Sequence, residues 1–399
     1  MTRIESGSDL RRPDTGGHQK VTMVELFFDL VFVFAITQLS HALLADVSLA
    51  NALRVGFLLL AVWWAWIYTS WVTNWLDPDQ PAVRLMLFAL MAAGLVVSAA
   101  IPRAFTDRGL AFAVGFVVIQ LGRSLFTCWA LRGLSDVHYR NFIRIACWLA
   151  LSGTLWIGGG LASGTQRTVL WTAALAVEYI GPAAGFWTPH LGRSSTRDWN
   201  VDATHMAERC GLFVIIALGE SILVSGATFA TAAWQPTTML AFAVAVLGTI
   251  AMWWIYFNTG AAEAAERFTA SEDPGAMARL AYTYLHLPII AGIVVSAVAD
   301  ELVLAHPYGK TDIATAATLI GGSMLFLVGN VLFKRATARR WPLSHLVGIA
   351  LLVVVVPSTA RLWPVGVAAL CAAVMILVAA WETLSLSKTS PTSSVNGGH

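Results

Sequence analysis

The sequence predicts an all-α fold, a polytopic transmembrane helix bundle, and three observations carry that prediction. Of the 399 residues, 57% are hydrophobic and 12% are charged, where a soluble domain carries about 25% charged residues. The mean hydropathy is +0.69. Apolar runs near 20 residues, the length that crosses a bilayer as a helix, follow one another along the chain. These features exclude a soluble enzyme, and a net charge of +2 indicates no nucleic-acid partner.

The length rule predicts twelve spans. They are expected at residues 24–44, 52–75, 83–101, 109–131, 142–161, 168–188, 210–230, 238–258, 280–300, 313–333, 342–357 and 362–383. The eleventh is the shortest and is interrupted at Pro357, so eleven spans is the alternative. The first twenty residues lack the apolar core of a signal peptide.

Lysine and arginine predict the orientation, because cytoplasmic loops carry the excess of both. With twelve spans, eighteen of the 25 basic residues fall on the side that holds both termini, six fall on the other side, and Arg123 lies within a span. Both termini are therefore expected in the cytoplasm.

The two halves of the chain match in the same order at four places, which predicts a tandem repeat. The matching pairs are 93–99 with 291–297, 122–126 with 329–333, 66–68 with 254–256, and Glu25 with Glu208. Six spans per unit would make the repeats parallel; coincidence of composition is the alternative. The expected organisation is a polar tail at 1–20, a first repeat at 21–190, a linker at 191–208, a second repeat at 209–384 and a disordered tail at 385–399.

Ionisable residues in the apolar runs are candidates for a binding site, because a charge at mid-bilayer costs roughly 2.5–3.5 kcal/mol on insertion scales. The candidates are Glu25, Asp29, Arg123, Glu178, His205, Glu208, Arg209, Glu220 and His286. A buried polar network that holds helices together is the alternative. The apolar runs contain three acids away from their ends, Asp29, Glu178 and Glu220, but only one such arginine, Arg123. At least one acid must therefore be protonated, bind a cation or be exposed to water.

Aromatic residues form the second unusual feature. Trp64, Tyr68 and Trp71 fall on one helical stripe of the second span, and Trp253 and Trp254 lie in the eighth. An interfacial aromatic belt accounts for some of them. The alternative is a wall of π-faces for a cationic or flat apolar guest.

The sequence predicts no metal site and implies no cofactor. His205 and Glu208 have a spacing that can bind metal, but no second cluster of donors accompanies them. The four cysteines form no C-x-x-C pair and are interpreted as packing residues: Cys128, Cys147, Cys210 and Cys371.

Two long motifs resemble the bacterial low temperature requirement A family. They are Glu25-Leu-Phe-Phe-Asp-Leu-Val-Phe-Val-Phe-Ala and His205-Met-Ala-Glu-Arg-Cys-Gly-Leu-Phe-Val-Ile-Ile-Ala-Leu-Gly-Glu-Ser221, with the Trp-Trp segments of spans two and eight in support. The resemblance covers roughly residues 20 to 384. It implies a multi-pass protein of the bacterial inner membrane, linked by name to growth in the cold, and no established biochemistry.

The first span alone also resembles a helix of another family. Phe27-Phe-Asp-Leu-Val-Phe-Val-Phe-Ala-Ile-Thr37 is similar to the F-S-D helix of potassium channels with six spans per repeat. Phe28 stands where that motif has serine, and the seventh span has no matching Phe-x-Asp. The resemblance implies common architecture rather than ion conduction.

Three functions fit these features. The first is movement of a cation, or of a small solute with protons, through a site lined by carboxylates and tryptophans. The second is an intramembrane enzyme for a lipidic or isoprenoid substrate, in which Asp29, Glu178 and Glu220 would protonate the substrate or hold Mg²⁺ bound to diphosphate. The third is a non-catalytic membrane sensor.

Overall fold

The structure is a computed structural model that describes residues 10–11, 20–133, 136–195, 201–258 and 273–387. Within these ranges the regular structure is helical and no β-sheet is present. The predicted all-α bundle is therefore confirmed. By packing, the chain divides into two compact units.

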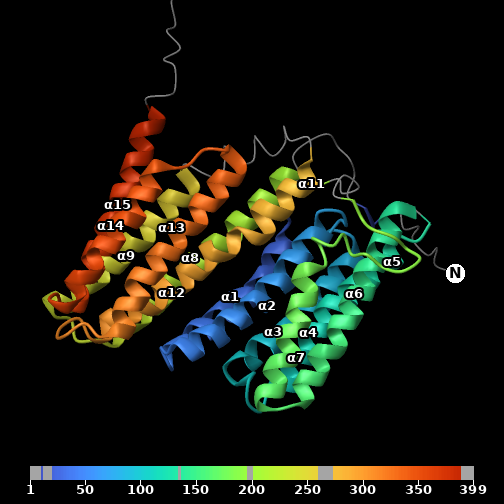
Figure 1. Cartoon of the computed structure of the whole chain (residues 1–399), viewed down its shortest axis with the longest axis horizontal. Coiled ribbons are helices and arrows are strands. Elements are labelled where there is room, and N and C mark those ends of the chain that lie inside the picture. Colours follow the sequence, from blue (N-terminus) through green and yellow to red (C-terminus); the bar gives the residue numbers. More distant parts are fainter. Residues whose placement is uncertain (1–9, 12–19, 134–135, 196–200, 259–272, 388–399) are drawn as a thin grey trace, which may run out of the picture. The chain divides into compact units, whose positions relative to one another are not determined.

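Unit 1 comprises Met1–Glu220 and Phe268–Leu287. Its helices are α1 (Met23–Leu44), α2 (Leu49–Thr73), α3 (Pro81–Ala100) with η2 (Ile101–Arg103), α4 (Gly109–Val117), η3 (Val118–Gly122), α5 (Arg123–Ala130), α6 (Asp136–Leu161), α7 (Gly164–Ile180), the first part of α8 (Ala203–Thr231), α11 (Pro274–Met277) and η6 (Ala278–Tyr284). Helix α1 packs on α2 and α3, and α6 packs on α4 and α7. Helices α1 to α7 run from blue to green in Figure 1, and α11 is yellow-orange.

Unit 2 comprises Ser221–Arg267 and Pro288–His399. It holds the remainder of α8, α9 (Pro236–Tyr256), most of α12 (His286–Ala305), α13 (Ile313–Ala338), α14 (Leu343–Val355) with η7 (Val356–Ala360), and α15 (Pro364–Ser387). Helix α15 packs on α9, α13 and α14. The predicted pair of six-helix repeats and its residue boundaries stay predictions.

Local sequence signals explain where several helices begin. Thr22 and Glu25 form a reciprocal capping box at the start of α1. Ser48 caps α2, and Asp312 caps α13 by accepting a hydrogen bond from the Thr315 amide at 2.7 Å. Each cap satisfies backbone N–H groups that the first turn of a helix leaves without partners.

Eleven helical segments of the described chain are long and apolar enough to cross a bilayer. One of them joins α4, η3 and α5 into a single span, Gly109–Ala130. Helix α7, at the sixth predicted span, has 17 residues, the lower limit of the length that crosses a bilayer. The protein is a multi-pass membrane protein, and its described residues form eleven such helices and the shorter α7.

Small residues let α12 and α13 approach closely in unit 2. A Cβ atom added at Gly292 would lie 2.4 Å from the Phe326 amide nitrogen, and one at Gly322 would lie 2.6 Å from Ser296 Oγ. Small residues at contacts between helices are a common device of membrane proteins, because packing and not the hydrophobic effect holds the helices together in lipid.

Candidate functional site

Four ionisable side chains meet between α1 and α8, and we call them the charge layer: Glu25, Asp29, His205 and Arg209. His205 Nε2 lies 2.9 Å from Glu25 Oε1, and Arg209 Nη2 lies 2.9 Å from Asp29 Oδ1. All four side chains are fully buried. Because both pairs repeat after four residues on each helix, the two helices present the layer while running in the same direction.

Helix α2 supplies the neutral partners of the charge layer. Trp66 Nε1 donates a hydrogen bond to Asp29 Oδ1 at 2.8 Å, and its ring lies 5.5 Å from the Arg209 guanidinium carbon. Arg209 also donates to Ser70 Oγ at 3.3 Å. Within the described chain, Asp29 Oδ2 and Arg209 Nη1 have no hydrogen-bond partner. The ion pair of Asp29 and Arg209 can therefore accept one further hydrogen bond at Oδ2 and donate another from Nη1.

The histidine of the layer is held on both sides of its ring. Asn74 Nδ2 lies 3.2 Å from His205 Nδ1 and also donates to the Asp202 carbonyl. With the amide in this orientation, Nδ1 accepts and the ring proton sits on Nε2, which points at Glu25. Asn74 thereby orients the imidazole toward the carboxylate.

A further acid lies deeper along the same two helices. Thr37 Oγ1 of α1 donates to Glu220 Oε2 of α8 at 2.6 Å, and Glu220 is buried. Glu25 and Thr37 are twelve residues apart on α1, or about 18 Å along the helix axis. Polar groups therefore line more than half of a hydrocarbon core roughly 30 Å thick.

A second buried cluster surrounds Glu178 of α7. Its carboxylate accepts from Gln120 Nε2 at 2.7 Å, Ser152 Oγ at 2.5 Å and Trp156 Nε1 at 2.9 Å. Gln120 in turn accepts from Arg123 Nη2 at 2.6 Å. Arg123 thus reaches Glu178 through an amide and forms no direct ion pair with it in the described chain.

The remaining hydrogen bonds of Arg123 go to α2. Its Nη1 donates to the Ala65 carbonyl at 3.1 Å and to Thr69 Oγ1 at 3.0 Å, and the guanidinium carbon lies 5.4 Å from the Tyr68 ring centroid. Arg123 Nε has no partner in the part of the chain that the structure describes. This fully buried cation is therefore surrounded by neutral groups.

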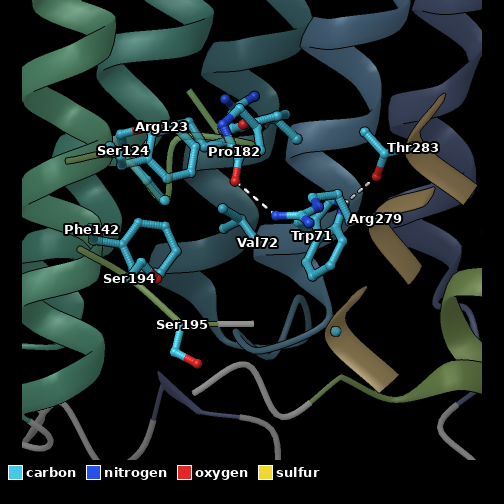
Figure 2. A pocket seen from close by; sticks show the side chains of 15 residues that line it. Trp71, Val72, Arg123, Ser124, Phe142, Pro182, Ser194, Ser195, Arg279 and Thr283 are labelled. Carbon is cyan, nitrogen blue, oxygen red and sulfur yellow. Dashed lines mark hydrogen bonds between the residues drawn. The ribbon is translucent and has the colours of Figure 1, made fainter. Parts of the chain in front are cut away.

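A pocket of about 680 Å³, its open mouth included, lies beside Arg123 in unit 1. Figure 2 shows side chains from α2, α5, α6, the segment 182–195 and η6 in its wall. Its lining includes the aromatic residues Trp71, Phe142 and Phe186 and the two arginines Arg123 and Arg279. The walls are mostly apolar, and two guanidinium groups interrupt them.

Both pocket arginines belong to π-helical irregularities. Arg123 directly follows η3, and Arg279 lies within η6, each a segment with π-helical turns. Segments of this kind are rare and frequently lie at functional sites. Phe186 adds a third irregularity to the wall, with a φ of 48°, a left-handed conformation that costs a non-glycine residue energy.

Other candidates from the sequence lie elsewhere. Trp64 is buried and stacks on Tyr179 at 3.9 Å between ring centroids. Trp253 and Trp254 of unit 2 are 43% and 40% exposed, a position typical of lipid-facing side chains.

Two further polar candidates also lie outside the charge layer. Glu208 is exposed and accepts a hydrogen bond from the Val21 amide at 3.2 Å. His286 is buried, with Nδ1 2.9 Å from the Ala281 carbonyl and its ring stacked on Tyr282.

Sequence reasoning missed three polar residues. Gln120 stands one turn before Arg123, so helical spacing could have identified it. Arg279 lies one residue before the ninth span expected from the sequence, at 280–300, whereas in the structure it belongs to η6 and lines the pocket. Asp300, at the predicted end of that span, lines a smaller cavity in unit 2.

Among the residues that the structure describes, no group of three or more His, Cys, Asp or Glu side chains is arranged to hold a metal ion.

Comparison with known proteins establishes the family. The family model described as bacterial low temperature requirement A protein matches residues 20–380. The chain belongs to this family. It is 42% identical, over 94% of its own length and 92% of the relative's, to an uncharacterized protein of Rhizobium meliloti (strain 1021). No solved structure matches the chain. The resemblance that the two motifs predicted is thereby confirmed, and both motifs contribute residues to the charge layer.

Proposed function

We propose that this low temperature requirement A protein moves protons, another cation, or a small solute together with protons across the bilayer. The observation that carries the proposal is the buried series of polar pairs between α1 and α8: Glu25 with His205, Asp29 with Arg209, and Thr37 with Glu220. Proton relays in membranes are built from carboxylates and histidines arranged in this way.

A purely structural role would not require these residue types. Neutral residues of similar volume often hold helices together as well as buried ion pairs do, because removing two charges from water costs several kcal/mol per ion. The ion pair of Asp29 and Arg209 also retains an acceptor, Oδ2, and a donor, Nη1, without partners in the described chain. Because each residue of the pair can form a further hydrogen bond, Asp29 and Arg209 can exchange one partner for another. Such exchange is what ion or proton transfer along α8 toward Glu220 requires.

The proposal includes a location. The distribution of basic residues supports the bacterial inner membrane with both termini in the cytoplasm. In that orientation Glu25 lies near the cytoplasmic end of α1, and Glu220 lies deeper along the path.

The test is ion flux in reconstituted vesicles. Purified protein is placed in liposomes that contain a pH-sensitive dye, and proton uptake is measured after a pH gradient is imposed. We expect Glu220→Gln to abolish flux while membrane insertion and thermal stability are retained, because the amide cannot take up and release a proton at neutral pH. Asp79→Asn is the matched control, since its side chain is 67% exposed and lies outside the path.

Unchanged flux in the Glu220→Gln protein, with Asp79→Asn also unchanged, would contradict the assignment of Glu220 to the path. Repeating the assay with Na⁺ and K⁺ gradients in place of the pH gradient identifies the ion. Flux that follows a metal cation and not the pH gradient would replace the proton by that cation in the proposal.

A further inference from the structure

We propose that the pocket of unit 1 binds a small organic anion, a carboxylate or phosphate that carries a flat apolar group. Two guanidinium groups, Arg123 and Arg279, line this pocket, and no acidic side chain is among its described lining residues. The inference names the solute class of the transport proposed above. It rests on that proposal only in treating the bound anion as cargo.

Arg123 carries a buried positive charge. Its guanidinium is fully buried, yet each hydrogen bond that it makes to a described residue goes to a neutral acceptor. A buried charge without a counter-charge is costly. Glu178 does not supply one directly, because Gln120 stands between them and three donors already hold that carboxylate. An anion in the pocket beside Arg123 would provide the missing charge.

Arg279 has N–H groups available for a ligand. Within the described chain this half-buried arginine makes one hydrogen bond, from Nη1 to the Pro182 carbonyl at 2.7 Å, which Figure 2 draws as a dashed line. Its other N–H groups form a planar fork that suits the two oxygens of a carboxylate or phosphate. The contact with Pro182 fixes the side chain in the pocket wall before any ligand arrives.

The walls of the pocket favour an anion with an apolar group. Aromatic rings of Trp71, Phe142 and Phe186 line the pocket beside the arginines. Trp71 is held in place, because its Nε1 donates to Thr283 Oγ1 at 3.0 Å. A bare inorganic anion would contact only the guanidiniums, whereas an anion with a flat hydrocarbon group would also pack against the aromatic wall.

Equilibrium dialysis of the full-length protein in detergent tests the inference. The probe is radiolabelled 2-naphthoate, and 2-naphthamide, which has nearly the same shape without the charge, is its control. Dodecanoate forms a second arm, since an anion with an apolar body could come from the lipid as well as from the aqueous phase. We expect at least one anion to bind roughly ten- to a hundredfold more tightly than the amide, the range of a charged hydrogen bond.

Three arginine variants locate the binding. Arg123→Gln and Arg279→Gln should each weaken anion binding roughly tenfold or more and leave amide binding unchanged. Arg103→Gln, whose side chain is 57% exposed on η2, should bind the anion normally. If Arg123→Gln fails to fold, Arg279→Gln carries the test, because Arg279 makes a single hydrogen bond and is half-buried.

Each outcome decides the inference. Preference for naphthoate supports a water-soluble anion, and preference for dodecanoate supports a lipid-derived one. Equal binding of anion and amide, binding of neither anion, or full binding by both Arg123→Gln and Arg279→Gln would overturn the site. Equilibrium dialysis applies no gradient, so it tests the site independently of transport. Anion binding by a protein that shows no ion flux in liposomes would retain the site and overturn the transport proposal. Ion flux by a protein that binds no anion would overturn the site and retain the transport proposal.

Discussion

Two buried arginines of unit 1 share most of their surroundings and differ in one respect. Arg209 and Arg123 are both fully buried in membrane-spanning helices, and each lies over an aromatic ring of α2, at 5.5 Å from Trp66 and 5.4 Å from Tyr68. Arg209 pairs with a carboxylate, while the hydrogen bonds of Arg123 within the described ranges go to neutral acceptors and its side chain borders a cavity. The same residue type in similar apolar runs therefore serves two purposes.

The two arginines differ in the source of the negative charge that compensates them. In the charge layer Arg209 meets its anion, Asp29, on a second helix, so the protein itself neutralises this arginine. At the pocket the protein provides the cation and the walls, and we infer that the ligand provides the anion. This distinction predicts different responses to the same substitution at the two positions.

The largest effect is expected at Arg209. Arg209→Gln leaves the Asp29 carboxylate buried without its counter-charge, and breaking a buried pair in this way costs about 3–5 kcal/mol. Thermal or denaturant unfolding in detergent measures the loss. The double variant Asp29→Asn with Arg209→Gln should recover most of it, since no charge is then left alone. A double variant no more stable than the single one would show that the pair is not self-compensating.

A smaller loss is expected at Arg123. Arg123→Gln removes donors from three neutral acceptors and should cost about 1–3 kcal/mol, the cost of unsatisfied buried groups. Adding Glu178→Gln should not restore stability, because Gln120, Ser152 and Trp156 already satisfy that carboxylate. If Glu178→Gln instead recovers as much stability in Arg123→Gln as Asp29→Asn recovers in Arg209→Gln, then Glu178 is the counter-charge of Arg123. The two arginines would then not differ in how they are compensated.

The smallest effect concerns the rings beneath the arginines. Trp66→Phe removes the hydrogen bond to Asp29 Oδ1 and keeps an aromatic ring under Arg209. The expected cost is about 0.6 kcal/mol and at most about 1.7 kcal/mol, the average and the maximum for hydrogen bonds between membrane helices. Tyr68→Phe is the matched control, since the described chain shows no hydrogen bond from its hydroxyl. Equal losses in the two variants, measured by unfolding in detergent, would show that the indole bond adds nothing to the layer.

Local periodicity determined much of the fold in advance. Apolar runs predicted the helical spans, because a helix must satisfy its own backbone groups in lipid and needs a set length to cross it. The spacing of Glu25 and Asp29 likewise placed both carboxylates on one face of α1, and the family resemblance followed from contiguous motifs.

The partners of these residues could not be read in the same way. His205 and Arg209 lie 180 residues after the carboxylates that they meet, and no sequence spacing specifies which helices will pack together. The sequence left the aromatic stripe of α2 open between an interfacial belt and a wall for a guest. In the structure Trp64 packs against Tyr179, while Trp71 lines the pocket.

The sequence by itself therefore determined that the chain is a helical membrane protein of the low temperature requirement A family, with charges buried in its spans. The tertiary structure was needed to show that Arg209 pairs with Asp29, whereas Arg123 and Arg279 line an apolar pocket and pair with no carboxylate among the described residues. The physical reason is that hydropathy and helical period act between near neighbours in sequence, whereas charge compensation depends on contacts that packing creates between distant helices.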